Sequence, residues 1–146
     1  MLRFALLVLL IPVFGSAQTR RVQMLESYDA ETFGRYQDEG RTIVLQFHSL
    51  SCDLCIQQEV VLKKIAAEND PTTPSFFQAV LSMHGNLAML YSAKPSMLLV
   101  FRGKRLIGRE TGLTNGKALR ELISRSLMKS RGRPLPRSKR EFKPKR

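Results

Sequence analysis

The alternation of hydrophobic and polar residues predicts a chain of short strands and helices. Continuous apolar runs rich in β-branched and aromatic residues are typical of buried strands. They predict five strands, the first of them from a weak signal, at residues 22–25, 43–47, 76–81, 97–101 and 105–109. Gly103 lies between the last two runs, which predicts a hairpin turn at 102–104.

Stretches with helical spacing lie between or after these strands, at residues 30–39, 52–68, 85–90 and 117–127. Asp29 is the expected cap of the first helix, and Thr114 or Asn115 of the last. In the second helix we expect an apolar stripe of Ile56, Val60, Leu62, Ile65 and Ala66, with Gln57, Gln58, Lys63 and Lys64 facing mostly outward. Three methionines are expected to fill the core, namely Met83, Met89 and Met97.

Residues 1–17 have the pattern of a cleavable export signal. Arg3 gives a positive start, residues 4–14 form an apolar segment too short to span a bilayer, and residues 15–17 are small. We therefore expect an exported protein, periplasmic or secreted, whose mature chain begins near Gln18. An uncleaved N-terminal anchor is the alternative interpretation.

Positive charge is concentrated at the C-terminal end. Residues 129–146 contain nine Lys or Arg and one acidic residue, whereas residues 18–128 contain fourteen basic and eleven acidic residues. The terminal segment also has three prolines and few apolar residues, so it cannot bury enough surface to fold alone. The sequence thus predicts one domain at 18–128 and a disordered basic tail at 129–146.

Such a tail would attract anionic surfaces in a salt-dependent manner. Export disfavours nucleic acid as its partner, and Phe142 is the only aromatic residue of the tail, so nothing there suggests stacking on successive bases. A solvated tail with no specific partner is the alternative.

Cys52 and Cys55 are the only cysteines of the chain, and they lie between a predicted strand and a predicted helix. A disulfide between residues so close in sequence closes too small a loop to constrain the unfolded chain much. A cysteine at a helix N-terminus also faces free backbone N–H groups, which stabilise a thiolate. The pair is therefore interpreted as a reversible redox centre.

The chain resembles the thioredoxin family over most of residues 26–128. The resemblance is carried by the apolar strand and short loop leading into Cys52-Asp53-Leu54-Cys55, by Lys94-Pro95-Ser96 before the strand at 97–101, and by Gly103 and Gly112 before the last helix. It implies an α/β thioredoxin fold, with a central mixed β-sheet flanked by helices.

The resemblance also implies a thiol–disulfide oxidoreductase with no cofactor besides its own disulfide. Cys52 would attack a partner disulfide and Cys55 would resolve the mixed disulfide. Pro95 would be cis, and with Lys94 and Gly112 it would contact an extended substrate. The expected partners are protein thiols or disulfides and a redox partner that the sequence does not identify, and we expect a monomer.

Several residues depart from the family pattern. Ser51 replaces the usual Trp before the first cysteine, and Gln46 replaces the buried acid of many relatives. His48, Asp53 and Glu59 are the candidates for proton transfer or for tuning the cysteines. Because Asp53 adds negative charge near the sulfur, we expect a reducing or intermediate redox potential.

Two other interpretations remain open. A non-catalytic thioredoxin-like protein could bind extended polypeptide beside Pro95 and dock on an anionic surface through residues 129–146. Alternatively, the two cysteines could bind zinc together with His48 and His84, although no second C-x-x-C pair supports this. We therefore expect no metal ligands.

Overall fold

The computed structural model describes residues 25–68, 70 and 72–131. The segment expected to be an export signal and most of the segment expected to be a basic tail lie outside the described residues, as does most of the strand expected at 22–25. Leu25 is described, and the first strand, β1, is Glu26–Ser27 directly after it.

Five strands form one mixed sheet in the order β1-β3-β2-β4-β5. β2 (Thr42–His48) is central and pairs in parallel with β3 (Ser75–Val80), which pairs in parallel with β1. β4 (Met97–Arg102) and β5 (Arg105–Thr111) continue the sheet in antiparallel register. Gly103 in the turn between them has a φ of +56°, and a Cβ atom there would lie 3.1 Å from the Gln37 carbonyl oxygen, so glycine is required.

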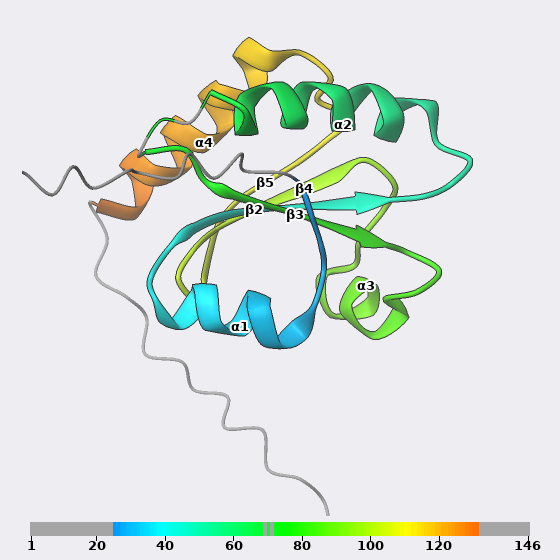
Figure 1. The fold of residues 1–146 in the computed structure, drawn as a ribbon, viewed down its shortest axis with the longest axis horizontal. Coiled ribbons are helices and arrows are strands. Elements are labelled where there is room, and N and C mark those ends of the chain that lie inside the picture. The colour runs from blue at the N-terminus through cyan, green and yellow to red at the C-terminus, as the bar shows by residue number, and fades with distance from the viewer. Residues whose placement is uncertain (1–24, 69, 71, 132–146) are drawn as a thin grey trace, which may run out of the picture.

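The helices cover both faces of this sheet (Figure 1). α1 (Ala30–Asp38) and α3 (Gly85–Tyr91) lie on one face, and α2 (Asp53–Ala66) and α4 (Gly116–Arg131) lie on the other. The predicted caps form, since Asp29 accepts a hydrogen bond from the Thr32 N–H and Asn115 accepts one from the Lys117 N–H, both at 2.8 Å. α4 ends at Arg131, past the predicted end at 127.

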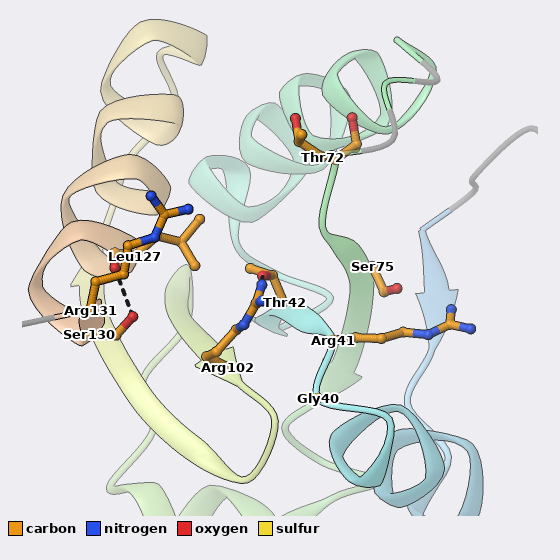
Figure 2. A pocket seen from close by; sticks show the side chains of 10 residues that line it. Gly40, Arg41, Thr42, Thr72, Ser75, Arg102, Leu127, Ser130 and Arg131 are labelled. Atoms are coloured by element: carbon orange, nitrogen blue, oxygen red, sulfur yellow. Dashed lines mark hydrogen bonds between the residues drawn. The ribbon is translucent and has the colours of Figure 1, made fainter. Parts of the chain in front are cut away.

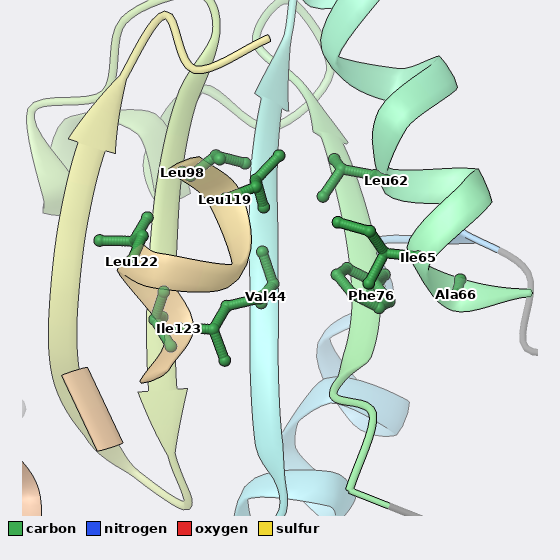
Figure 3. Close-up of a cluster of buried hydrophobic side chains, with 10 residues drawn as sticks. Val44, Leu62, Ile65, Ala66, Phe76, Leu98, Leu119, Leu122 and Ile123 are labelled. Carbon is green, nitrogen blue, oxygen red and sulfur yellow. The ribbon is translucent and has the colours of Figure 1, made fainter. Parts of the chain in front are cut away.

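Alternation along the central strands divides the hydrophobic core into two layers. Val44, Phe76 and Leu98 face α2 and α4, where Leu62, Leu119 and Leu122 pack against them (Figure 3). The next residues along the same strands belong to the opposite layer, in which a group of aromatic rings packs edge to face: Phe33, Tyr36, Phe77, Tyr91 and Phe101. The central strand β2 is therefore buried on both faces.

The buried face of α2 differs from the predicted stripe. Ile56 and Val60, expected in the core, are 51% and 49% exposed, while Gln58, expected to face outward, is completely buried. The residues that contact the core lie at helical spacing that includes Cys55 and Gln58: Cys55, Gln58, Leu62, Ile65 and Ala66. Gln58 can occupy a core position because its side chain forms hydrogen bonds there.

The prediction for the methionines is correct for only one of them. Met97 is buried at the start of β4, but Met83 and Met89 are 75% and 73% exposed. α3 contributes Leu87, Ala88 and Tyr91 to the core, and Met89 lies on its other side. No helix among the described residues is long and apolar enough to cross a membrane.

Candidate redox site at the start of helix α2

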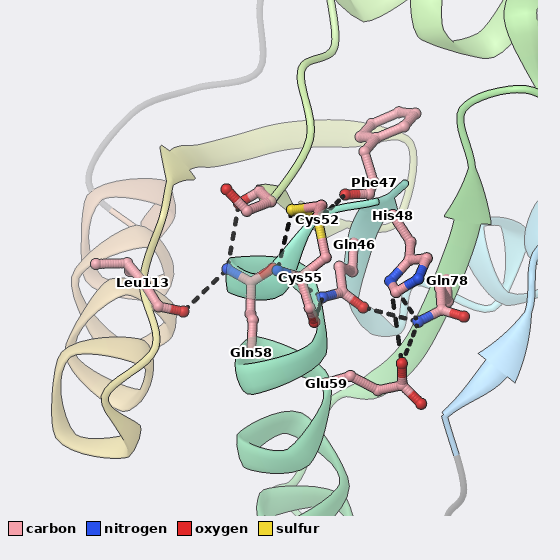
Figure 4. Close-up of a disulfide and its surroundings, with 10 residues drawn as sticks. Gln46, Phe47, His48, Cys52, Cys55, Gln58, Glu59, Gln78 and Leu113 are labelled. Atoms are coloured by element: carbon pink, nitrogen blue, oxygen red, sulfur yellow. Dashed lines mark hydrogen bonds and ion pairs between the residues drawn. A yellow bond between two sulfur atoms is a disulfide. The ribbon is translucent and has the colours of Figure 1, made fainter. Parts of the chain in front are cut away.

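Cys52 and Cys55 form a disulfide at the N-terminus of α2 (Figure 4). Cys52 is the N-cap residue, and its Sγ accepts a hydrogen bond of 3.1 Å from the Cys55 backbone N–H. Since the helix N-terminus points this N–H at the sulfur already in the oxidised state, the same group can stabilise a thiolate once the disulfide is reduced.

The two cysteines differ in exposure. Cys52 is partly exposed at the tip of the helix, whereas Cys55 is completely buried beneath it. The Cys55 sulfur lies 3.9 Å from the carbonyl oxygen of Phe47, near the end of β2. A partner in solution can therefore reach Cys52, while Cys55 is placed to react only within the protein.

Two buried glutamines hold this helix end against the sheet. Gln46 on β2 donates through Nε2 to the Cys55 carbonyl oxygen at 3.0 Å and to Gln58 Oε1 at 2.9 Å. Gln58 in turn donates through Nε2 to the carbonyl oxygens of Ser96 and Leu113, at 3.2 and 2.9 Å. These bonds join β2, α2 and the loops on either side of the β4–β5 hairpin.

The loop that carries Pro95 lies against the disulfide helix. The Ser96 N–H donates to the Phe47 carbonyl oxygen at 2.9 Å, and the Gly112 N–H donates to the Ser96 carbonyl oxygen at 3.1 Å. Phe47 thus lies next to both Cys55 and Ser96. The structure brings together Cys55, Ser96 and Gly112, three parts of the chain that are far apart in sequence.

The expectation of a cis peptide bond before Pro95 is wrong for this structure, in which that bond is trans and the described residues include no cis bond. A turn replaces it: the Met97 N–H donates to the Lys94 carbonyl oxygen at 3.1 Å, with Pro95 and Ser96 as the central residues. Ser96 adopts a left-handed φ of 60° in this turn. A turn with proline at its second position and a residue of positive φ at its third forms with a trans bond before the proline.

His48 and Glu59 lie on the other side of Gln46 from Gln58 (Figure 4). Gln78 joins them to it: its Nε2 donates to Gln46 Oε1 at 3.0 Å and to Glu59 Oε2 at 3.1 Å, and lies 3.5 Å from His48 Nδ1. His48 is buried at the end of β2, with Nδ1 3.9 Å from Glu59 Oε2.

Glu59 is ionised at neutral pH. A hydrogen bond from Lys63 Nζ, together with one from Gln78, lowers the pKa of Glu59 despite the opposing effect of partial burial. Among the described residues the hydrogen-bond partners of Glu59 are Lys63 and Gln78, so Glu59 is linked to the Cys55 backbone carbonyl through the two amides of Gln78 and Gln46.

Asp53, Lys94 and Pro95 are exposed on the surface around the cysteines, and Gly112 is partly exposed. Sequence reasoning missed two other exposed residues here, Leu50 and Leu54, which are 81% and 48% exposed on either side of Cys52. It also missed Gln58 and Gln78. The helical spacing of Gln58 from Cys55 and Leu62 is the signal that could have revealed its burial.

No group of three or more His, Cys, Asp or Glu side chains that could hold a metal ion occurs in the part of the chain that the structure describes. His84, considered with the cysteines as a zinc ligand, lies at the start of α3, where its Nδ1 is 3.0 Å from the Val80 carbonyl oxygen.

The fold is similar to that of solved thioredoxin structures. A thioredoxin of Trypanosoma brucei brucei has a TM-score of 0.61 and 22% identity, covering 75% of this chain and 95% of that one. Trxlp of Edwardsiella tarda has a TM-score of 0.61 and 20% identity, with coverage of 68% and 97%. Thioredoxin f2 of Chlamydomonas reinhardtii gives 0.59 and 23%, with coverage of 69% and 94%. The predicted thioredoxin fold is confirmed. No protein-family model and no curated protein sequence matches the chain.

Replacing Gln58 by Ala should destabilise the protein by about 2–4 kcal/mol. The substitution leaves the Leu113 carbonyl without its Gln58 donor, which costs about 1–3 kcal/mol for an unsatisfied buried polar group. It also removes one of the two hydrogen bonds of the Ser96 carbonyl and one of the two made by Gln46 Nε2. Urea unfolding of the oxidised protein measures the loss. Gln57→Ala is the matched control, because Gln57 is exposed on the same helix turn, and it should change stability by less than about 0.5 kcal/mol. Equal effects of the two substitutions would contradict the role given to Gln58.

Proposed function

We propose that this protein is an exported thiol–disulfide oxidoreductase that acts on protein thiols and disulfides through Cys52 and Cys55. The observation that carries the proposal is the asymmetry of the pair: Cys52 is partly exposed at a helix N-terminus, and Cys55 is buried beneath it. The thioredoxin fold around the pair supports the same chemistry.

In the reducing direction, the Cys52 thiolate attacks one sulfur of the partner disulfide. A bond forms between Cys52 and that sulfur, and the other partner sulfur leaves as a thiolate. Cys55 then loses its proton to water and attacks the Cys52 sulfur, which re-forms the internal disulfide and releases the second partner thiolate. Two electrons pass from the cysteine pair to the partner, and the reverse sequence oxidises a partner dithiol.

The surface around Cys52 favours an extended, partly apolar polypeptide as partner. Leu50 and Leu54 offer exposed apolar side chains beside the sulfur. The Lys94-Pro95 turn and Gly112 lie beside the Phe47 carbonyl, joined to it through Ser96. A polypeptide lying across the disulfide would thus contact apolar side chains on one side and the Pro95 turn on the other.

A binding protein without redox activity is the second candidate. The observation that favours it is Gln46, which occupies the buried position next to Cys55 with an amide that cannot accept a proton from the thiol. On that account the fold holds extended polypeptide beside Pro95, and the disulfide is inert.

Replacing Cys55 by Ser should trap partners. Without the resolving thiol, the mixed disulfide formed by Cys52 cannot be resolved. Covalent adducts that a reductant cleaves should therefore accumulate and be visible on non-reducing gels. Cys52→Ser is the matched control and should trap none, because Cys55 is buried. The binding-protein account is favoured instead if neither variant forms adducts with unfolded disulfide-containing polypeptides.

We further propose that residues 1–17 direct export and that residues 129–146 contact anionic surfaces, on the strength of the sequence pattern. Fractionation of the source cells should then recover a chain beginning at or near Gln18 outside the cytoplasm. High salt should release it from the envelope, because the attraction of a basic segment to anionic groups is screened by salt. A cytoplasmic chain that keeps residue 1, or binding that salt does not weaken, would contradict this proposal.

A further inference from the structure

A cavity, shown in Figure 2, lies at the end of the sheet where β2 begins, whereas the disulfide follows the other end of β2. Its volume is about 570 Å³. It forms where β2 begins, where β4 ends and where α4 ends, and its lining includes Thr42, Thr72, Arg102, Leu127, Ser130 and Arg131. The cysteines follow the other end of β2, so the length of this strand separates the two sites by roughly 20 Å.

The cavity is positively charged. Arg102 and Arg131 line it, and neither has a carboxylate partner among the described residues. A third arginine, Arg41, also lines it, but its guanidinium lies 3.9 Å from the centre of the Tyr36 ring and pairs with Glu39 at 2.6 Å. Two guanidinium groups are thus available to an anion.

The hydroxyl groups of the cavity add a donor for an anion. Arg102 Nη1 donates to Thr42 Oγ1 at 2.9 Å, which fixes the guanidinium and leaves the Thr42 hydroxyl proton free to donate. The acidic side chain of Asp70 accepts hydrogen bonds from the Thr72 N–H and hydroxyl, at 2.7 and 2.6 Å, and does not itself line the cavity. Arginine next to hydroxyl donors is the combination that recognises phosphate oxygens.

We propose that this cavity binds a phosphate group through Arg102, Arg131 and Thr42. The cavity is larger than phosphate itself and lies within the usual range of ligand sites, so there is room for an organic portion beside Leu127. The site is separate from the cysteines, so the proposal of a phosphate site does not depend on the proposed redox function.

Titration of the full chain with inorganic phosphate, followed by amide NMR at constant ionic strength, tests the proposal. Saturable shifts should appear at residues 40–42, 102 and 127–131. Arg102→Gln should weaken binding about tenfold or more, because it removes a charged hydrogen-bond donor. Thr42→Val, which keeps every charge, should weaken binding about threefold to tenfold.

Arg125→Gln is the matched control, since Arg125 is exposed on the same helix, outside the cavity, and the substitution removes the same charge. It should change phosphate affinity by less than about twofold, because charges in solvent are screened. All variants should keep the wild-type rate of disulfide reduction by dithiothreitol, which shows an intact fold without assuming any enzymatic activity. Shifts that do not saturate, or equal weakening by Arg102→Gln and Arg125→Gln, would overturn the proposal.

Two further titrations distinguish the sources of the phosphate group. One uses glycerol 3-phosphate, and the other uses phosphatidylcholine vesicles containing phosphatidic acid. If Arg102→Gln weakens the binding of glycerol 3-phosphate only, the ligand is a soluble phosphomonoester. If it weakens binding to the vesicles, the ligand is a lipid headgroup. Both results support the site. The proposal would be overturned if Arg102→Gln weakened the binding of none of the three probes, inorganic phosphate included.

Discussion

The side-chain amide of Gln58 is the interaction on which the geometry around the cysteines depends. It receives one hydrogen bond from Gln46 and donates two, to the carbonyl oxygens of Ser96 and Leu113. Because Gln58 lies one turn after Cys55 on α2, these bonds fix the start of that helix relative to β2 and to the Pro95 turn. A hydrophobic residue would fill the same space but would leave the Leu113 carbonyl without its donor and the Ser96 carbonyl with only the Gly112 N–H.

The same amide explains why Gln46 can replace a buried acid. Gln46 is occupied on both ends, with Nε2 bonded to Cys55 and Gln58 and Oε1 bonded to Gln78. It therefore orders the site without carrying charge. Among the described residues no carboxylate bonds directly to Cys55, since Glu59 is linked to it only through Gln78 and Gln46.

The sequence allowed most of the architecture to be predicted, because the central strands are continuous apolar runs and the capping residues are distinctive. The errors occurred where tertiary contacts decide the outcome. Gln58 is polar by type but buried by its partners, and Met83 and Met89 are apolar by type but lie on the exposed side of a short helix. The bond before Pro95 was assigned by resemblance, whereas the local turn with Ser96 at positive φ accommodates a trans bond. The cavity at the other end of the sheet was not predictable, since it joins residues from three distant segments.

The measurement that tests the account most directly is the redox equilibrium of Cys52 and Cys55 in graded thiol–disulfide buffers, followed by alkylation of the free thiols. The account predicts one reversible two-electron midpoint. Asp53 disfavours the thiolate and hence the reduced form, so the midpoint should lie nearer to about −270 mV than to the about −120 mV of strong oxidants. A pair that stays oxidised across all buffers would contradict the account and leave a binding protein with an inert disulfide.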